Sequence, residues 1–170
     1  MDKTMKVTVD GVELKVKISE EELAKLTKVK EPKKTGYERV DKGKRYFIAT
    51  GVGSVEAFTE DNYNLDDTHF KNANYYSDRV LAGDIARADK LMRQLRRFAA
   101  ENCEEVEWDC INSHYHIYYN YRAKMLCAYD ACFCRDLGSI FFDNMKTAQK
   151  AIDTFKDELL WYFTEYRDRV

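Results

Sequence analysis

Basic side chains recur along one predicted helix, at a spacing that could hold a polyanion. Arg79, Lys90, Arg93 and Arg97 fall within one narrow sector of a helical wheel drawn at about 100° per residue. Arg96 belongs to the same dense basic run, and the sector lies opposite the apolar stripe of the helix. The pattern predicts contact with phosphates or with an acidic protein surface. The commoner alternative is an ordinary solvated face, since the helix dipole also favours basic residues near a helix C-terminus.

Histidines and cysteines in the second half of the chain have the chemistry of zinc ligands. The candidates are Cys110, His114, His116, Cys127, Cys132 and Cys134. If residues 114–121 and 125–134 form paired strands, two histidines and two cysteines could converge. No CxxC pair typical of a structural zinc site is present, however. Free cysteines more often pack as small apolar residues, and we assign neither a metal ligand nor a cofactor.

Catalytic alternatives find little support in the sequence. A Cys–His nucleophile needs an activated thiolate, and no cysteine lies at a predicted helix N-terminus or within a family signature. The chain has no Walker A loop, GxGxxG, GxSxG or HExxH motif. We therefore assign no catalytic residue and expect a protein that is not an enzyme.

Four carboxylates cluster in a segment that we predict to be a polar loop, residues 60–67. They are Glu60, Asp61, Asp66 and Asp67. The segment lacks the alternating ligands and the glycine of an EF-hand. A nuclease-like carboxylate pair is one interpretation, and a solvated loop is the one we favour.

The predicted elements that would position these residues repeat one order, strands followed by a long helix, twice along the chain. Strands at residues 45–49 and 52–58 precede a helix that is capped by Ser77 or Asp78 and ends near Asn102. A connecting strand at 106–110, a strand pair at 114–121 and 125–134 and a short extended segment at 139–142 precede a second helix. That helix is capped by Asp143 or Asn144 and runs to about Arg167. An aromatic pair stands just before each cap.

The N-terminal segment is a smaller predicted unit. Residues 6–18 alternate around Asp10-Gly11, which predicts a β-hairpin. Ser19 and Glu22 form a capping box for a short helix to about Leu26. Residues 28–36 are charged, contain the only proline and end in glycine, so they are the best candidate for a linker.

Composition limits the class of protein. The 170 residues are 45% hydrophobic and 34% charged, as in a folded globular chain. A net charge of −2 excludes a strongly acidic DNA mimic and a uniformly basic nucleic-acid coat. No apolar run approaches a membrane span, and the N-terminus has no segment of signal-peptide type. We expect a cytoplasmic protein, with its five cysteines reduced.

Several segments resemble small proteins encoded by phages and prophages of gut Firmicutes. The similarity lies at residues 34–40, 45–48, 86–99, 148–153 and 157–163 and covers most of residues 34–166. Some proteins of this size and origin are type II-A anti-CRISPR proteins, which bind the RNA-guided nuclease of the host and block DNA cleavage. The resemblance implies such a partner but no particular inhibitory residue.

The sequence therefore predicts an α+β protein. A small ββα unit at residues 1–30 would precede strands-then-long-helix units at 37–103 and 104–170, with antiparallel sheets. The expected function is binding and inhibition of a type II CRISPR nuclease, or of its guide-RNA complex, by occlusion or conformational locking. The alternatives are a phage nucleic-acid-binding protein that uses the basic helix face, and a metal-dependent enzyme that modifies guide RNA or a nucleotide signal.

Overall fold

The computed structural model describes residues 3–9, 12–19, 34–105, 107–108, 111–131, 135 and 137–166. The chain divides into two compact units, Met1–Lys34 and Thr35–Val170. Antiparallel sheets and helices make up the described chain, which confirms the predicted α+β class. No helix among the described residues is both long and apolar enough to cross a membrane.

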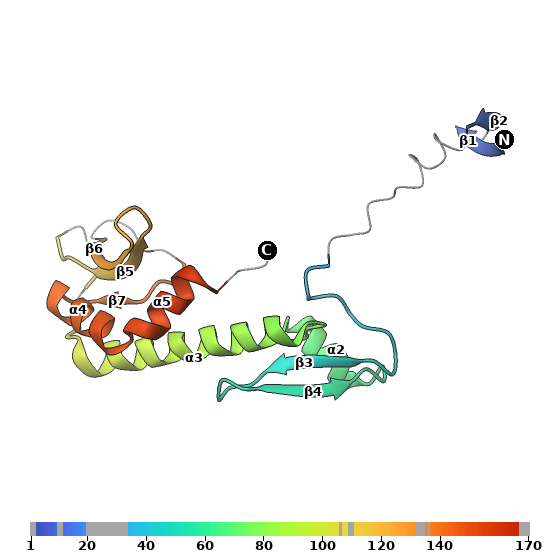
Figure 1. Ribbon diagram of the computed structural model, residues 1–170. Helices are drawn as coiled ribbons and strands as arrows, with labels where there is room; N and C mark the ends of the chain where they lie inside the picture. The colour runs from blue at the N-terminus through green and yellow to red at the C-terminus, as the bar shows by residue number, and fades with distance from the viewer. Residues whose placement is uncertain are drawn as a thin grey trace. The chain divides into compact units, whose positions relative to one another are not determined.

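The first unit contains an antiparallel hairpin of β1 (Lys3–Val9) and β2 (Val12–Ile18) (Figure 1). Its register sets several apolar residues opposite one another, for example Val7 with Leu14 and Val9 with Val12. This confirms the predicted hairpin. The predicted turn residues, Asp10 and Gly11, and the predicted helix after Ser19 lie outside the described residues.

The second unit begins with a two-stranded sheet that is packed on both faces. β3 (Arg45–Ala49) pairs with β4 (Val55–Thr59), and Phe47 also pairs with Tyr76. Residues alternate between the faces of a strand. Phe47 therefore packs with Tyr76 against Leu81 at the start of α3 (Arg79–Asn102), whereas Tyr46 stacks on Tyr75 on the opposite face. β3 forms as predicted, and β4 begins three residues later than predicted.

The structure of residues 60–67 differs from the prediction. The expected loop is shorter: after the buried Glu60, three exposed residues lead into helix α2 (Asn64–Lys71), which lies beside the β3–β4 hairpin (Figure 1). Asp66 and Asp67 lie in the first turn and Lys71 in the last, an order that the helix dipole favours. The polar composition of residues 60–67 indicated a loop because Asn, Asp and Thr are weak helix formers.

A second sheet repeats the arrangement later in the chain. β5 (Tyr115–Asn120) lies between β6 (Met125–Asp130) and β7 (Phe141–Phe142), and all the pairing is antiparallel. Each aromatic pair thus adds to the edge of a sheet just before a helix cap. Asp78 caps α3, and Asn144 caps α4 (Met145–Thr154). Residues 106, 109 and 110 of the predicted connecting strand lie outside the described residues, and Glu107 and Trp108 are not in a strand.

The prediction of one long C-terminal helix is wrong, because this part of the chain forms two helices. α4 ends at Thr154 and α5 (Lys156–Thr164) begins after Phe155, whose φ and ψ of −113° and 23° are not helical. The hydroxyl of Thr154 donates to the carbonyl of Lys150, a contact that bends helices. The Phe155 ring packs edge-on against Phe98 of α3, 5.7 Å between centroids, so the break delivers an aromatic ring to the core.

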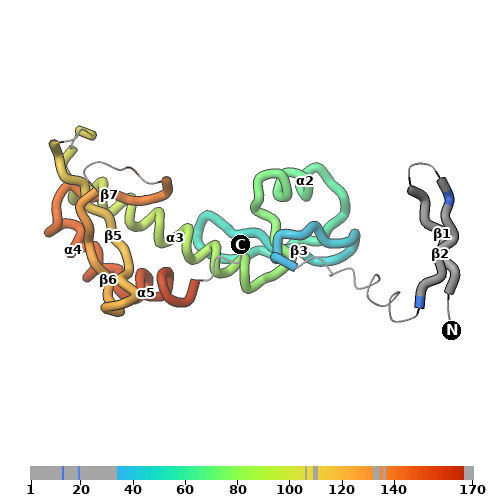
Figure 2. The backbone as a smooth tube through the Cα atoms, turned by 90° about the horizontal axis from the view of Figure 1, so that it is seen from above, coloured from blue at the N-terminus to red at the C-terminus, as the bar shows by residue number. Residues whose placement is uncertain are grey.

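Helix α3 joins the two cores of the second unit (Figure 2). Its first turns pack on the β3–β4 sheet through Leu81 and Ala82. Its later turns place Leu91 and Leu95 in a cluster with the helices and sheet that follow. That second cluster also contains the buried residues Phe142, Ala148, Ala151, Ile152 and Leu159.

Candidate functional site

The predicted basic residues are all exposed along α3. We define the basic face as Arg79, Lys90, Arg93, Arg96 and Arg97, each exposed in the structure. With a rise of about 1.5 Å per residue, the face extends over roughly 27 Å. Among the described residues, Arg97 alone of the five has an ion-pair partner, Glu101 at 3.7 Å on the next turn. Both groups of that pair are well exposed, so it contributes little and leaves the guanidinium accessible.

The basic face borders a wide cavity with a mixed charge. The cavity has a volume of about 680 Å³ and lies between Lys90 and Gln94 of α3, Gly53 in the β3–β4 turn and the start of α5. On its wall Arg87 holds Glu158 through two hydrogen bonds of 2.8 and 3.1 Å and lies 3.9 Å from the centre of the Trp161 ring. The Arg87 guanidinium lowers the pKa of Glu158. Because acids and bases share this wall, the cavity itself has no preference for an anion.

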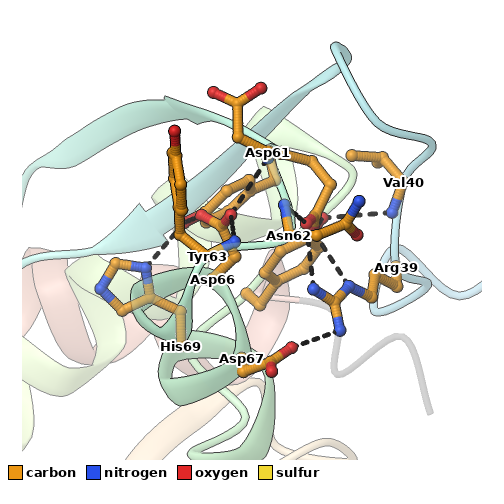
Figure 3. Close-up of polar contacts among 11 residues, drawn as sticks. Arg39, Val40, Asp61, Asn62, Tyr63, Asp66, Asp67 and His69 are labelled. Atoms are coloured by element: carbon orange, nitrogen blue, oxygen red, sulfur yellow. Dashed lines mark hydrogen bonds and ion pairs between the residues drawn. The ribbon is translucent and has the colours of Figure 1, made fainter.

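The carboxylate cluster forms a buried network that the sequence did not reveal (Figure 3). Glu60 is 1% exposed and accepts two 2.9 Å hydrogen bonds from Arg39, which lies 21 residues earlier. It also accepts from the Tyr75 hydroxyl at 2.9 Å and from the Asn62 N–H. The Arg39 hydrogen bonds and charge lower the pKa of Glu60, although burial opposes that shift.

Asp66 is the second buried carboxylate of the network. Its side chain accepts from the Tyr46 hydroxyl at 2.8 Å and from the N–H groups of Asp61 and Tyr63 at 3.0 Å. Burial raises the pKa of Asp66, but these three donors outweigh it and the pKa is lowered overall. Asp67 binds Arg39 at 2.6 Å at the surface, and Asp61 is exposed.

A histidine extends the network toward solvent. The Tyr46 hydroxyl lies 2.9 Å from Nδ1 of His69 and donates its proton to Asp66. A hydroxyl has one proton, so the Tyr46 oxygen accepts a hydrogen bond from Nδ1–H of His69. Figure 3 shows His69 at the outer end of this chain of contacts.

The chemistry of this network is structural. All four oxygens of the two buried carboxylates accept hydrogen bonds from groups of the protein, so both carboxylates hold neighbouring segments together. The favoured interpretation of a solvated loop is therefore wrong for Glu60 and Asp66. Sequence reasoning missed Arg39, Tyr46 and Tyr75 because their contacts span 15 to 35 residues.

The two histidines among the candidate zinc ligands are packed against aromatic rings. His114 is 4% exposed and lies under Trp108 with 3.7 Å between ring centroids. His116 contacts the rings of Tyr129 and Phe141. Within the part of the chain that the structure describes, no three His, Cys, Asp or Glu side chains are grouped to hold a metal. Cys110, Cys132 and Cys134 lie outside the described residues.

Two free cysteines, Cys103 and Cys127, lie among the described residues. Burial raises the pKa of Cys103, which keeps it protonated and poorly nucleophilic. Cys127 is half-buried and directs its sulfur toward the Met125 carbonyl at 3.9 Å. Neither cysteine has a histidine partner among the described hydrogen bonds.

Comparison of the chain with protein-family models, with curated proteins and with solved structures finds no match. The arguments about function therefore rest on the residues and geometry given above.

Proposed function

We propose that this protein binds a macromolecular partner through the basic face of α3 and thereby inhibits a host defence nuclease. The observation that carries the proposal is the exposure of five cations on one helix, four of them without an ion-pair partner in the described chain. The helix is held by both cores of the unit, so its side chains extend from a rigid support. Such a surface suits phosphates or an acidic protein patch.

The partner that we propose is the RNA-guided DNA endonuclease of a type II CRISPR system. Support comes from the resemblance of residues 34–166 to phage proteins, and from the polyanionic guide RNA that such a nuclease exposes. Contact along roughly 27 Å of helix would allow occlusion of the DNA channel or locking of one conformation.

The test is co-purification with type II effector nucleases, with and without guide RNA, followed by a DNA cleavage assay. We expect a stable complex and reduced cleavage. Arg93→Glu combined with Arg97→Glu should weaken both effects by about tenfold or more. The matched control reverses two exposed cations outside α3, Arg122→Glu with Lys146→Glu, and should leave both effects unchanged. No complex and unchanged cleavage with several effectors would refute the proposal.

A second function uses the same face. The unpaired cations would also suit direct binding of nucleic acid by a phage accessory protein. In that case affinity for labelled DNA or RNA should fall steeply as salt rises, and the Arg93 and Arg97 reversals should reduce the slope. A salt-independent affinity, or no binding at low salt, would exclude this alternative.

A further inference from the structure

The central strand of the second sheet is paired on one side only over much of its length. β6 pairs with β5 from Tyr115 to Asn120, whereas β7 pairs only with Tyr115 and His116. In an antiparallel sheet, alternate residues direct their backbone groups to opposite sides of a strand. The Ala131 N–H donates to the His114 carbonyl on the β6 side, at 2.7 Å. The even-numbered residues of β5 therefore face β6, and Tyr115, Ile117 and Tyr119 face the other side.

Beyond β7, this other side of β5 has unused hydrogen-bonding groups. We call Ile117 and Tyr119 the open edge of β5. Within the described chain, neither the Ile117 carbonyl nor the Tyr119 N–H and carbonyl makes a hydrogen bond that the structure defines. An unpaired run of strand backbone is a template for a further strand.

A cavity lined mostly by apolar residues lies beside Ile117 of the open edge. It has a volume of about 260 Å³ and is bounded by Ile117 on one side and by residues 137–140, which lead into β7, on the other. Met92 and Leu95 of α3 and Leu159 and Phe163 of α5 also line it. His116 also lines it, but no Asp, Glu, Lys or Arg side chain does, so no Lys or Arg is present there to attract a polyanion such as nucleic acid.

We propose that the open edge of β5 binds an extended, uncharged segment of a partner protein as an additional strand. The backbone of that segment pairs with Ile117 and Tyr119, in the place that β7 leaves empty. Side chains of a strand point to one face at every second position, so an apolar residue of the segment enters the 260 Å³ cavity. This surface is separate from the basic face, and the inference does not depend on inhibition of a nuclease.

The choice of a strand follows from two demands at the same place. Backbone donors and acceptors on the edge require a partner that presents its own N–H and carbonyl groups at strand spacing. The cavity requires an apolar side chain next to them. An extended polypeptide meets both demands, whereas a helix satisfies its own backbone groups and a small apolar molecule leaves the edge unpaired.

The probe for the test is a library of random peptides displayed on phage, selected against the full chain. We expect enriched peptides with apolar residues at alternate positions and no charge between them. Synthetic copies should bind in fluorescence anisotropy and slow amide hydrogen exchange at Tyr119. The proposal is overturned if no peptide is enriched over an uncoated surface. Enriched peptides that leave amide hydrogen exchange at Tyr119 unchanged would also overturn it.

Two variants locate the binding. Ser139→Trp places a large ring at an exposed position on the cavity wall and should weaken peptide binding by about tenfold. Arg122→Trp, at an exposed turn position that does not line the cavity, is the matched control and should bind normally. Equal binding by both variants would overturn the proposal.

A third variant removes a backbone donor. Tyr119→Pro lacks the edge N–H, while the β5–β6 ladder does not use that group, so the circular dichroism spectrum should be retained and peptide binding lost. Should Tyr119→Pro fail to fold, Ser139→Trp decides the question. Self-association of the wild-type chain that Ser139→Trp abolishes would assign the edge to a second copy and overturn the proposal.

Discussion

Glu60 illustrates how an acidic residue in a polar stretch can become part of the interior. Its carboxylate is neutralised by Arg39, which is itself only one-third exposed, and Tyr75 supplies a further donor. Removing one partner of a buried ion pair is costly because the other remains desolvated without compensation. The network therefore holds the segment before β3 against the turn that leads to α2.

A substitution at Glu60 tests this role. Glu60→Gln should lower the free energy of unfolding by about 2 kcal/mol or more, because Arg39 loses its buried charged partner and keeps only Asp67 at the surface, and because the amide cannot accept four hydrogen bonds. Urea denaturation followed by circular dichroism measures the change. Asp61→Asn, at the neighbouring exposed carboxylate, should change stability by less than about 0.5 kcal/mol. Equal effects of the two substitutions would contradict the structural role of Glu60.

Acid should destabilise the fold through the same carboxylates. The folded-state pKa values of Glu60 and Asp66 are both lowered below their ordinary values of 4.5 and 3.8. The unfolded chain therefore takes up these protons first. The stabilisation is complete above the ordinary pKa values and is lost as pH falls below them. Urea midpoints measured between neutral pH and about pH 3 should fall, and the fall should be shallower in Glu60→Gln.

At the scale of the element, caps and glycines determine where helices begin. The Asp78 carboxylate accepts from the Val80 N–H at 2.7 Å at the start of α3. Just before it, Ser77 donates its N–H to the Gly36 carbonyl. Gly36 has a φ of +91°, and a β-carbon there would lie 2.6 Å from a methyl group of Leu81. The residue that ends the predicted linker is thus fitted against the first turn of α3.

Loss of the cap should destabilise the molecule measurably. Asp78→Ala removes the acceptor for the first N–H groups of α3 and should cost about 1 kcal/mol. Asp89→Ala, at an exposed position in the middle of the same helix, is the matched control and should have little effect. Thermal unfolding of both variants tests the difference, and a larger loss in the control would contradict the assignment of the cap.

At the scale of the molecule, α3 should make the second unit unfold cooperatively. Leu81 lies in the cluster beside the β3–β4 sheet, and Leu95 lies in the cluster with α4 and α5. Leu81→Ala and Leu95→Ala should each cost about 2–5 kcal/mol. Both should shift one common transition, because the same helix contributes to both clusters. Two separated transitions in calorimetry of either variant would show that the clusters unfold independently.

The N-terminal unit makes a separate prediction. The second unit begins at Thr35 and contains both hydrophobic clusters. A chain that begins at Thr35 should therefore have the same free energy of unfolding in urea denaturation as the full chain, within about 0.5 kcal/mol. A large loss of stability would show that the hairpin of β1 and β2 supports the second unit.

The sequence by itself determined the elements whose signals are local. Alternation predicted β3 and the strands of the hairpins, and the spacing of apolar residues with a capping carboxylate predicted α3 from its cap to Asn102. It also placed the five basic residues on one helix, since helical periodicity depends only on position in the chain. Those signals are contained within a few turns of backbone, which is why they could be read without knowledge of the tertiary structure.

Only the tertiary structure decided which polar residues are buried and which backbone groups stay unpaired. Glu60 and Asp66 enter the interior because Arg39, Tyr46 and Tyr75 come to them from other segments, and Phe155 leaves the helix because its ring fits beside Phe98. Among the described residues, Ile117 and Tyr119 form an open edge because β7 stops after two residues. Burial and pairing depend on what folds against a residue, and its own neighbours in sequence do not contain that information.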